Sequence, residues 1–301
     1  MKSRFPLRRR HFLLGALGLG SCEALSLAGK FDHWRRTPRT EGTPYEVSMA
    51  RASQESGIVH IAHSTHAIVL EKKRFLTDPW FHDPAFGALG HAVLPAVLPE
   101  HVGPLDAVLV SHDHPDHADF RAIDRLDKHA CVLVATASLA ARAKRAGFSD
   151  VHVLAPWEAF PMGTVTVHAV PALHDVYEIG FVVKSHDKSV YFAGDTRTHP
   201  DLPAIAERLA PTFGILPVDG TRIRGTALAV MTPEDAIAAA KVLRVKGVMP
   251  SHAEAVFVDP LVEHALATTV PQASEAFGRL AVANLPNVTC ALPAPGAFVP
   301  L

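Results

Sequence analysis

The chain has 301 residues, of which 48% are hydrophobic and 20% charged, with a formal net charge of −1. This length and apolar content suit one large domain with a substantial core, and three cysteines are too few for a disulfide framework. Residues 1–28 hold five of the 29 basic residues but one of the 30 acidic ones, so removing them would leave a net-negative chain. A net-negative surface argues against a nucleic-acid partner, because phosphate backbones demand a basic face.

Residues 1–28 are predicted to form an export signal of the twin-arginine type. The segment from Arg9 to Leu14 resembles the twin-arginine motif, and the apolar run 13–19 is too short to span a bilayer. Two processing routes stay open: cleavage after Ala28, or lipoprotein-type cleavage before Cys22. We therefore expect an exported protein of the periplasm or cell envelope, lipid-anchored through Cys22 in the second case.

Residues 29–57 are polar and are predicted to be a linker or an N-terminal arm, and residues 58–301 are predicted to form one large domain. Three strands are expected at its start, over 58–62, 67–70 and 74–77. His63 lies between the first two, and Asp78 ends the third before a proline. The following stretch, 80–104, is rich in proline, glycine and aromatic residues, which is typical of a functional loop, although its apolar side chains could equally be ordinary packing.

The densest group of metal-ligand residue types comes directly after the apolar run 107–110, which reads as a buried strand. In the extended segment that follows, His112 and His114 point to the same side, because side chains alternate along a strand. Pro115 then turns the chain, so that Asp116 and His117 can aim at a nearby point. Imidazole and carboxylate are ligands that zinc prefers, so the loop predicts a metal site.

Helices and strands alternate through the remainder. Helices are predicted at 118–126, 138–146, 201–209, 233–243 and 272–283, and strands at 131–135, 151–154, 165–170, 181–184, 190–193, 213–216, 248–249 and 288–292. The helix from Pro233 has Thr232 as its N-cap.

Four segments in this order resemble the signature of the metallo-β-lactamase superfamily. They are Ser111–His117, Val170–His174, Tyr191–Thr196 and Val248–His252. Upstream, His63-Ser64-Thr65 and Leu76–Pro79 resemble the opening hairpin of the branch with N-acylphosphatidylethanolamine-hydrolysing phospholipase D and ascorbate-6-phosphate lactonase. The resemblance implies an αββα sandwich of two packed sheets with helices outside.

The resemblance also implies a set of ligands for two divalent metal ions, with zinc expected. The first ion would be held by His112, His114 and His174, the second by Asp116, His117 and His252, and Asp195 would bridge them. His63 and Asp78 are expected around these ligands, with Asp78 holding the metal loop through hydrogen bonds. Asp116 and Asp195 are the carboxylates expected to serve catalysis.

The implied activity is hydrolysis by a hydroxide that bridges the two metals and attacks a carbonyl carbon or a phosphorus. We expect a small-molecule or lipid substrate, a phosphodiester such as an N-acyl phospholipid or a lactone. Arg222 and Arg224 could clamp its phosphate or carboxylate, or form a solvated basic loop. A β-lactamase, a nuclease and a non-catalytic metal-binding envelope protein are the rival interpretations. Peripheral contact with a membrane and the oligomeric state stay open.

The export prediction can be tested by changing Arg9 and Arg10 to lysine. The double variant is expected to remain as precursor in the cytoplasm, because arginine and lysine are not interchangeable at such a recognition site. Cell fractionation measures this, and normal export of the variant would contradict the prediction. The mass of the mature N-terminus distinguishes cleavage before Cys22 from cleavage after Ala28.

Overall fold

The computed structural model describes Arg39 and residues 42–301. The predicted export signal, including Arg9, Arg10 and Cys22, lies outside these residues. Within the described part of the chain, no helix combines the length and apolar character needed to cross a membrane.

The first sheet is built mainly from the N-terminal half of the domain. Its seven strands lie in the order β18-β1-β2-β3-β5-β6-β7. The strands β3, β5, β6 and β7 run parallel, whereas β1, β2 and β18 pair in antiparallel fashion. The bounds are β1 Gly57–Ala62, β2 Thr65–Leu70, β3 Lys73–Thr77, β5 Ala107–Val110, β6 Cys131–Val134, β7 Val151–Val153 and β18 Phe298–Pro300.

The second sheet comes from the C-terminal half, in the order β17-β14-β12-β11-β10-β9-β8. Here β11, β12, β14 and β17 are parallel, and β8, β9 and β10 form an antiparallel meander. The bounds are β8 Ala159–Met162, β9 Val165–Pro171, β10 Ile179–Lys184, β11 Ser189–Phe192, β12 Phe213–Pro217, β14 Gly247–Ser251 and β17 Thr289–Cys290.

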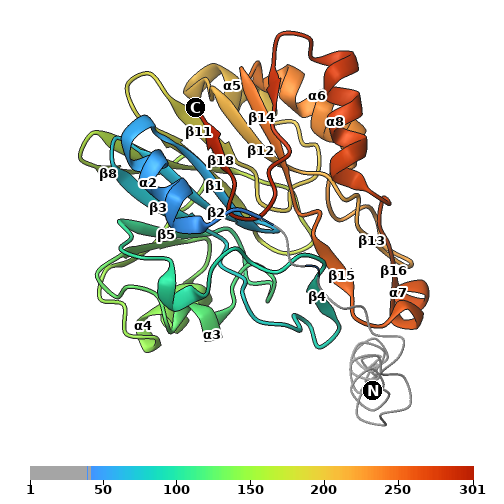
Figure 1. Ribbon diagram of the computed structural model, residues 1–301, viewed down its shortest axis with the longest axis horizontal. Coiled ribbons are helices and arrows are strands. Elements are labelled where there is room, and N and C mark those ends of the chain that lie inside the picture. The colour runs from blue at the N-terminus through green and yellow to red at the C-terminus, as the bar shows by residue number, and fades with distance from the viewer. Residues whose placement is uncertain (1–38, 40–41) are drawn as a thin grey trace, which may run out of the picture.

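The two sheets pack face to face and helices cover the outside (Figure 1). Helix α2 (Tyr45–Glu55) and helix α4 (Ala137–Arg145) pack on the first sheet, and α6 (Pro233–Leu243) and α8 (Ala273–Asn284) pack on the second, with α5 (Leu202–Leu209) beside α6. One apolar cluster joins both sheets, and another joins the second sheet to its helices. The predicted αββα sandwich is confirmed.

Two short strand pairs, one helix and one 3-10 turn complete the described structure beside the sandwich. Strand β4 (Leu89–His91) pairs with β15 (Ala255–Phe257), and β13 (Arg222–Ile223) pairs with β16 (Ala267–Thr268). Helix α7 (Pro260–Leu266) lies next to them (Figure 1), and a 3-10 turn, η2, covers Pro99–His101. The loop predicted over 80–104 thus contains only β4 and η2.

Two predicted segments differ from the structure. Part of the predicted linker or arm forms α2, which lies on the domain because Tyr45, Met49 and Ala52 are buried in the core. The helix predicted over 118–126 is limited to α3 (Phe120–Ile123), because the Asp119 side chain accepts a hydrogen bond from the Arg121 amide and so fixes the helix start.

The start of α6 shows how local sequence fixes an element that supports the second sheet. The Thr232 hydroxyl accepts from the Asp235 amide at 3.2 Å, and the Asp235 carboxylate accepts from the Thr232 amide at 3.1 Å. This capping box satisfies two amides that the helix itself cannot pair. Pro233 follows at the first helical position, where its missing N–H is no loss.

We expect Thr232→Ala to lower the free energy of unfolding by about 1 kcal/mol, because an N-cap hydroxyl contributes roughly this much. Urea denaturation followed by circular dichroism measures the change. Thr164→Ala, at an exposed threonine in the turn between β8 and β9, is the matched control. Equal stability of the two variants would contradict a stabilising role for the cap.

Candidate metal centre

The predicted metal residues follow the ends of strands from both sheets. The loop Ser111–His117 follows β5, Asp195 follows β11, and His252 follows β14. These strands belong to parallel runs in the two packed sheets, so their carboxyl ends reach the same edge of the sandwich. His174 reaches the same place from the end of β9.

One group of donors consists of His112, His114, His174 and Asp195. One ligand atom from each lies within 4.8 Å of those from the others. The His114 Nδ1 and His174 Nε2 atoms are 3.2 Å apart, so these two rings turn their nitrogens toward each other. His112 and Asp195 are buried, whereas His114 and His174 are half-buried, so this group reaches the surface.

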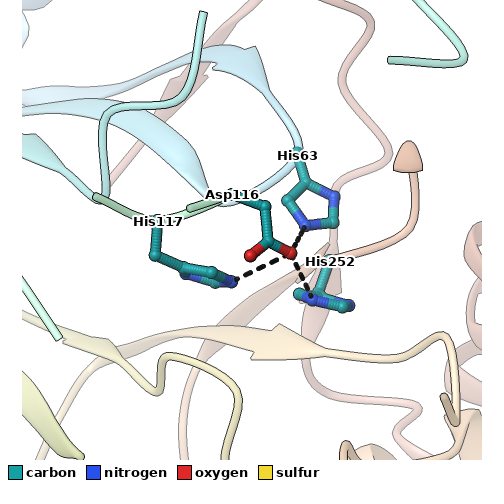
Figure 2. A group of neighbouring side chains, drawn as sticks. All are labelled: His63, Asp116, His117 and His252. Carbon is teal, nitrogen blue, oxygen red and sulfur yellow. Dashed lines mark ion pairs between the residues drawn. The ribbon is translucent and has the colours of Figure 1, made fainter. Parts of the chain in front are cut away.

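A second group consists of Asp116, His117, His252 and His63, and all four are buried. Figure 2 shows a ring nitrogen of each histidine turned toward the Asp116 carboxylate. The structure therefore brings together all seven predicted ligands and adds His63, which the sequence analysis placed among the supporting residues.

Asp195 joins the two groups. Its Oδ2 atom lies 3.0 Å from His117 Nε2 and 3.0 Å from His252 Nε2, although Asp195 also belongs to the first group. A carboxylate with donors of both groups around it is placed to share its oxygens between two ions.

The Asp78 carboxylate holds the loop after β5, as the sequence analysis expected. It accepts hydrogen bonds from the Ser111 amide at 2.7 Å and the Ser111 hydroxyl at 2.6 Å. Asp78 Oδ2 also lies 2.7 Å from His117 Nδ1. With Nδ1 engaged by a carboxylate, the Nε2 atom of His117 faces the second group as the ligand atom.

The sequence analysis did not identify two further acidic residues of the site, Glu178 and Asp219. Glu178 Oε1 lies 3.2 Å from His112 Nδ1, and Asp219 Oδ2 lies 3.0 Å from His252 Nδ1. Both are buried, and each stands next to a predicted strand, which is the one signal the sequence offered. Each turns the Nε2 atom of its histidine toward the donors.

The position of Glu178 also explains why residue 194 is a glycine. The Glu178 carboxylate accepts a hydrogen bond from the Asp195 amide at 2.7 Å, and a Cβ atom at position 194 would lie 2.1 Å from it. Gly194 has a φ of +67°, a conformation that other residues rarely adopt. Burial, together with the nearby Asp195 charge, raises the pKa of Glu178 to about 7.

The ionised carboxylates buried in the centre favour the binding of cations. Burial alone would raise the pKa of Asp195, but the imidazoles of His117 and His252 hold it well below its usual value. Burial lowers the pKa of His112 to about 3, so this ring is neutral, the form that binds a metal. Two buried carboxylates, Asp116 and Asp195, thus remain ionised among imidazoles.

Several buried polar atoms at this point have no hydrogen-bond partner in the described structure. They are His112 Nε2, His117 Nε2, Asp116 Oδ1, Asp195 Oδ1 and both ring nitrogens of His63. Buried polar atoms are normally paired, so a convergent set of unpaired donors needs an explanation. Metal ions would satisfy these imidazole and carboxylate atoms together, and the residues present therefore fit the implied ions.

The two predicted arginines are not brought to the centre. Arg222 lies on β13 and Arg224 just after it, and both are exposed. Among the described residues, no contact joins either guanidinium group to the two donor groups. Their role in substrate binding stays a prediction.

The chain matches the model of the Beta-lactamase superfamily domain over residues 73–253. It is 31% identical over 199 residues to a UPF0173 metal-dependent hydrolase of Korarchaeum cryptofilum, covering 65% of this chain and 82% of the relative.

Solved structures share the fold. A possible metal-dependent hydrolase from Veillonella parvula aligns with a TM-score of 0.68 at 19% identity, covering 82% of this chain and all of the other (100%). An isothiocyanate hydrolase from Delia radicum gut bacteria aligns with a TM-score of 0.67 at 20% identity, covering 81% and 98%.

These matches confirm the predicted superfamily, whereas the phospholipase D and lactonase branch stays a prediction. The family match spans the loop after β5, Asp195 and His252, which are the segments that build the centre. The chain belongs to the β-lactamase superfamily and is a metal-dependent hydrolase of the metallo-β-lactamase fold.

Proposed function

We propose that this hydrolase holds two divalent metal ions, both zinc, and cleaves a phosphodiester or a lactone. The observation that carries the proposal is the position of Asp195, which belongs to one donor group and lies 3.0 Å from two histidines of the other. His112, His114 and His174 would hold one ion, and Asp116, His117 and His252 the other, with Asp195 shared.

Two such ions supply an activated water molecule and stabilise the negative charge that develops on a carbonyl or phosphoryl oxygen. The role of the protein is to hold the metal-binding side chains in position. Asp78, Glu178 and Asp219 lie 2.7–3.2 Å from the Nδ1 atoms of His117, His112 and His252, which directs each Nε2 atom inward. The Glu178 carboxylate also orients the Asp195 backbone.

Apolar side chains around the first donor group support a substrate with an apolar portion. The Phe86 ring lies 5.3 Å from the His114 ring and is 45% exposed. Leu173, Val176 and Tyr177 lie near His174 in the chain and are also exposed. An acyl chain lying against these side chains would place its polar end at the half-buried histidines, which favours an N-acyl phospholipid or an acyl lactone.

The metal content tests the first part of the proposal. Protein purified without chelator and loaded with zinc is expected to hold two ions per chain, as measured by elemental analysis. His114→Ala should lose metal and activity together, because it removes a ligand. A wild-type stoichiometry of zero or one that added metal cannot raise would refute the binuclear proposal.

Asp195→Asn should lower metal content and reduce turnover about 100-fold or more, because it removes the negative charge between two cations. Asp113→Asn is the matched control in the same His-rich loop. The Asp113 carboxylate accepts from the Thr136 hydroxyl at 2.9 Å outside both donor groups, and an amide oxygen can replace that acceptor. Similar, small effects of both substitutions would show that Asp195 is not shared between ions.

The substrate class is tested by assaying zinc-loaded protein on long-chain and short-chain phosphodiesters, on lactones and on β-lactams. We expect long-chain phosphodiesters or lactones to be cleaved fastest. Phe86→Ala should lower kcat/KM for a long-chain substrate by about tenfold, because burying a phenylalanine contributes roughly 1.5–3 kcal/mol. Leu98→Ala, at another exposed apolar residue of the same loop, is the control. Preferential cleavage of β-lactams would overturn the proposed substrate.

A further inference from the structure

His63 occupies a constrained position in the turn between β1 and β2. Its φ is +51°, a left-handed conformation that is uncommon outside glycine, although histidine, asparagine and aspartate adopt it more often than other residues. The Glu254 carboxylate accepts a hydrogen bond from the His63 amide at 2.7 Å and also lies 3.0 Å from His60 Nε2. Glu254 follows β14 in the second sheet, so a contact between the two sheets fixes the His63 backbone.

The imidazole ring of His63 is buried with neither nitrogen paired. Its ring centroid lies 5.1 Å from that of Trp80 and 4.2 Å from that of His252. Burying a polar ring without hydrogen bonds is unfavourable, so the His63 imidazole needs a compensating interaction.

The distances around Asp116 identify that interaction. Asp116 Oδ2 lies 3.9 Å from His63 Nε2, 3.8 Å from His117 Nε2 and 3.8 Å from His252 Nε2. These separations are too long for hydrogen bonds. Two ligand atoms that are each about 2.1 Å from one ion are separated by roughly 3.4 to 4.2 Å, depending on the angle between them. His63 is therefore placed as the other two histidines are (Figure 2).

We propose that His63 is a direct ligand of the second ion. This inference rests on the proposed binuclear function. The second position then has four donors of its own, His63, Asp116, His117 and His252, before Asp195 is counted. With Asp195 counted for both, the second ion would have five protein donors and the first four, so the second leaves less room for water or substrate.

The two metal positions would therefore differ in their exposure and in their role. The second group is wholly buried, whereas His114 and His174 of the first are half-buried beside exposed Phe86. The first ion would thus be the one that meets substrate, and the second would hold the centre together.

His63→Asn tests the inference, because asparagine tolerates the left-handed backbone and removes the imidazole. His63→Gly is a second variant with no conformational restriction. The control is His199→Asn, since His199 is buried without a hydrogen bond to its ring and lies outside both donor groups. Its Nδ1 atom lies 3.8 Å from Asp201 Oδ2. Zinc binding is measured by competition with a chromophoric chelator, and cobalt loading is followed by visible absorption.

Wild type and His199→Asn are expected to bind two ions. The His63 variants should keep one ion at near wild-type affinity and bind the other about 100-fold more weakly or not at all. The visible bands of the cobalt-loaded variants should also change. Two ions bound with wild-type affinity and an unchanged cobalt spectrum in a folded His63 variant would overturn the inference while leaving the proposed function intact. Fewer than two ions in the wild type would overturn both.

Discussion

The buried carboxylate of Asp78 is the constraint on which the centre depends. Because β3 and β5 are parallel neighbours, Asp78 at the end of β3 lies directly beside the start of the loop after β5. Its side chain engages Ser111 and His117, while its backbone carbonyl accepts from the Thr65 hydroxyl at 2.8 Å. A single residue thereby joins the loop of the predicted ligands to the turn that carries His63. A charge buried this deeply is tolerated because donors surround it.

The centre also ties the two sheets to each other. Glu178 and Asp195 come from the second sheet, and the histidines beside them, His112 and His117, come from the first. Cations placed among these donors would attract carboxylates from both halves, so metal binding and sheet docking stabilise each other. A protein without metal would keep only the mutual attraction of imidazoles and carboxylates at this junction.

The sequence was sufficient to predict the strands and the ligand loop, because short apolar runs bounded by glycine, proline and acidic residues are local signals. It predicted Asp78 beneath that loop, but it could not reveal Glu178 or Asp219. Each of these is a single acidic residue with no motif, and only the packing of distant strands brings it to a histidine. The proximity of His63 to Asp116 and His252 could not be seen in the sequence for the same reason, since these neighbours are remote along the chain. Helix α2 was missed because no side-chain cap marks its start, so the sequence offers no local start signal there.

The pairing of strand β18 makes the completion of the first sheet depend on the C-terminal segment. Residues 298–300 pair with β1 at residues 57–59, so the first sheet acquires its outer strand only after the whole second sheet has been synthesised. The Gly296 amide donates to the His60 carbonyl at 2.7 Å, which brings the same late segment against the hairpin that carries His63. Until this segment pairs, the first sheet has an open edge along β1. The first sheet is therefore complete only when this last described strand has paired with β1.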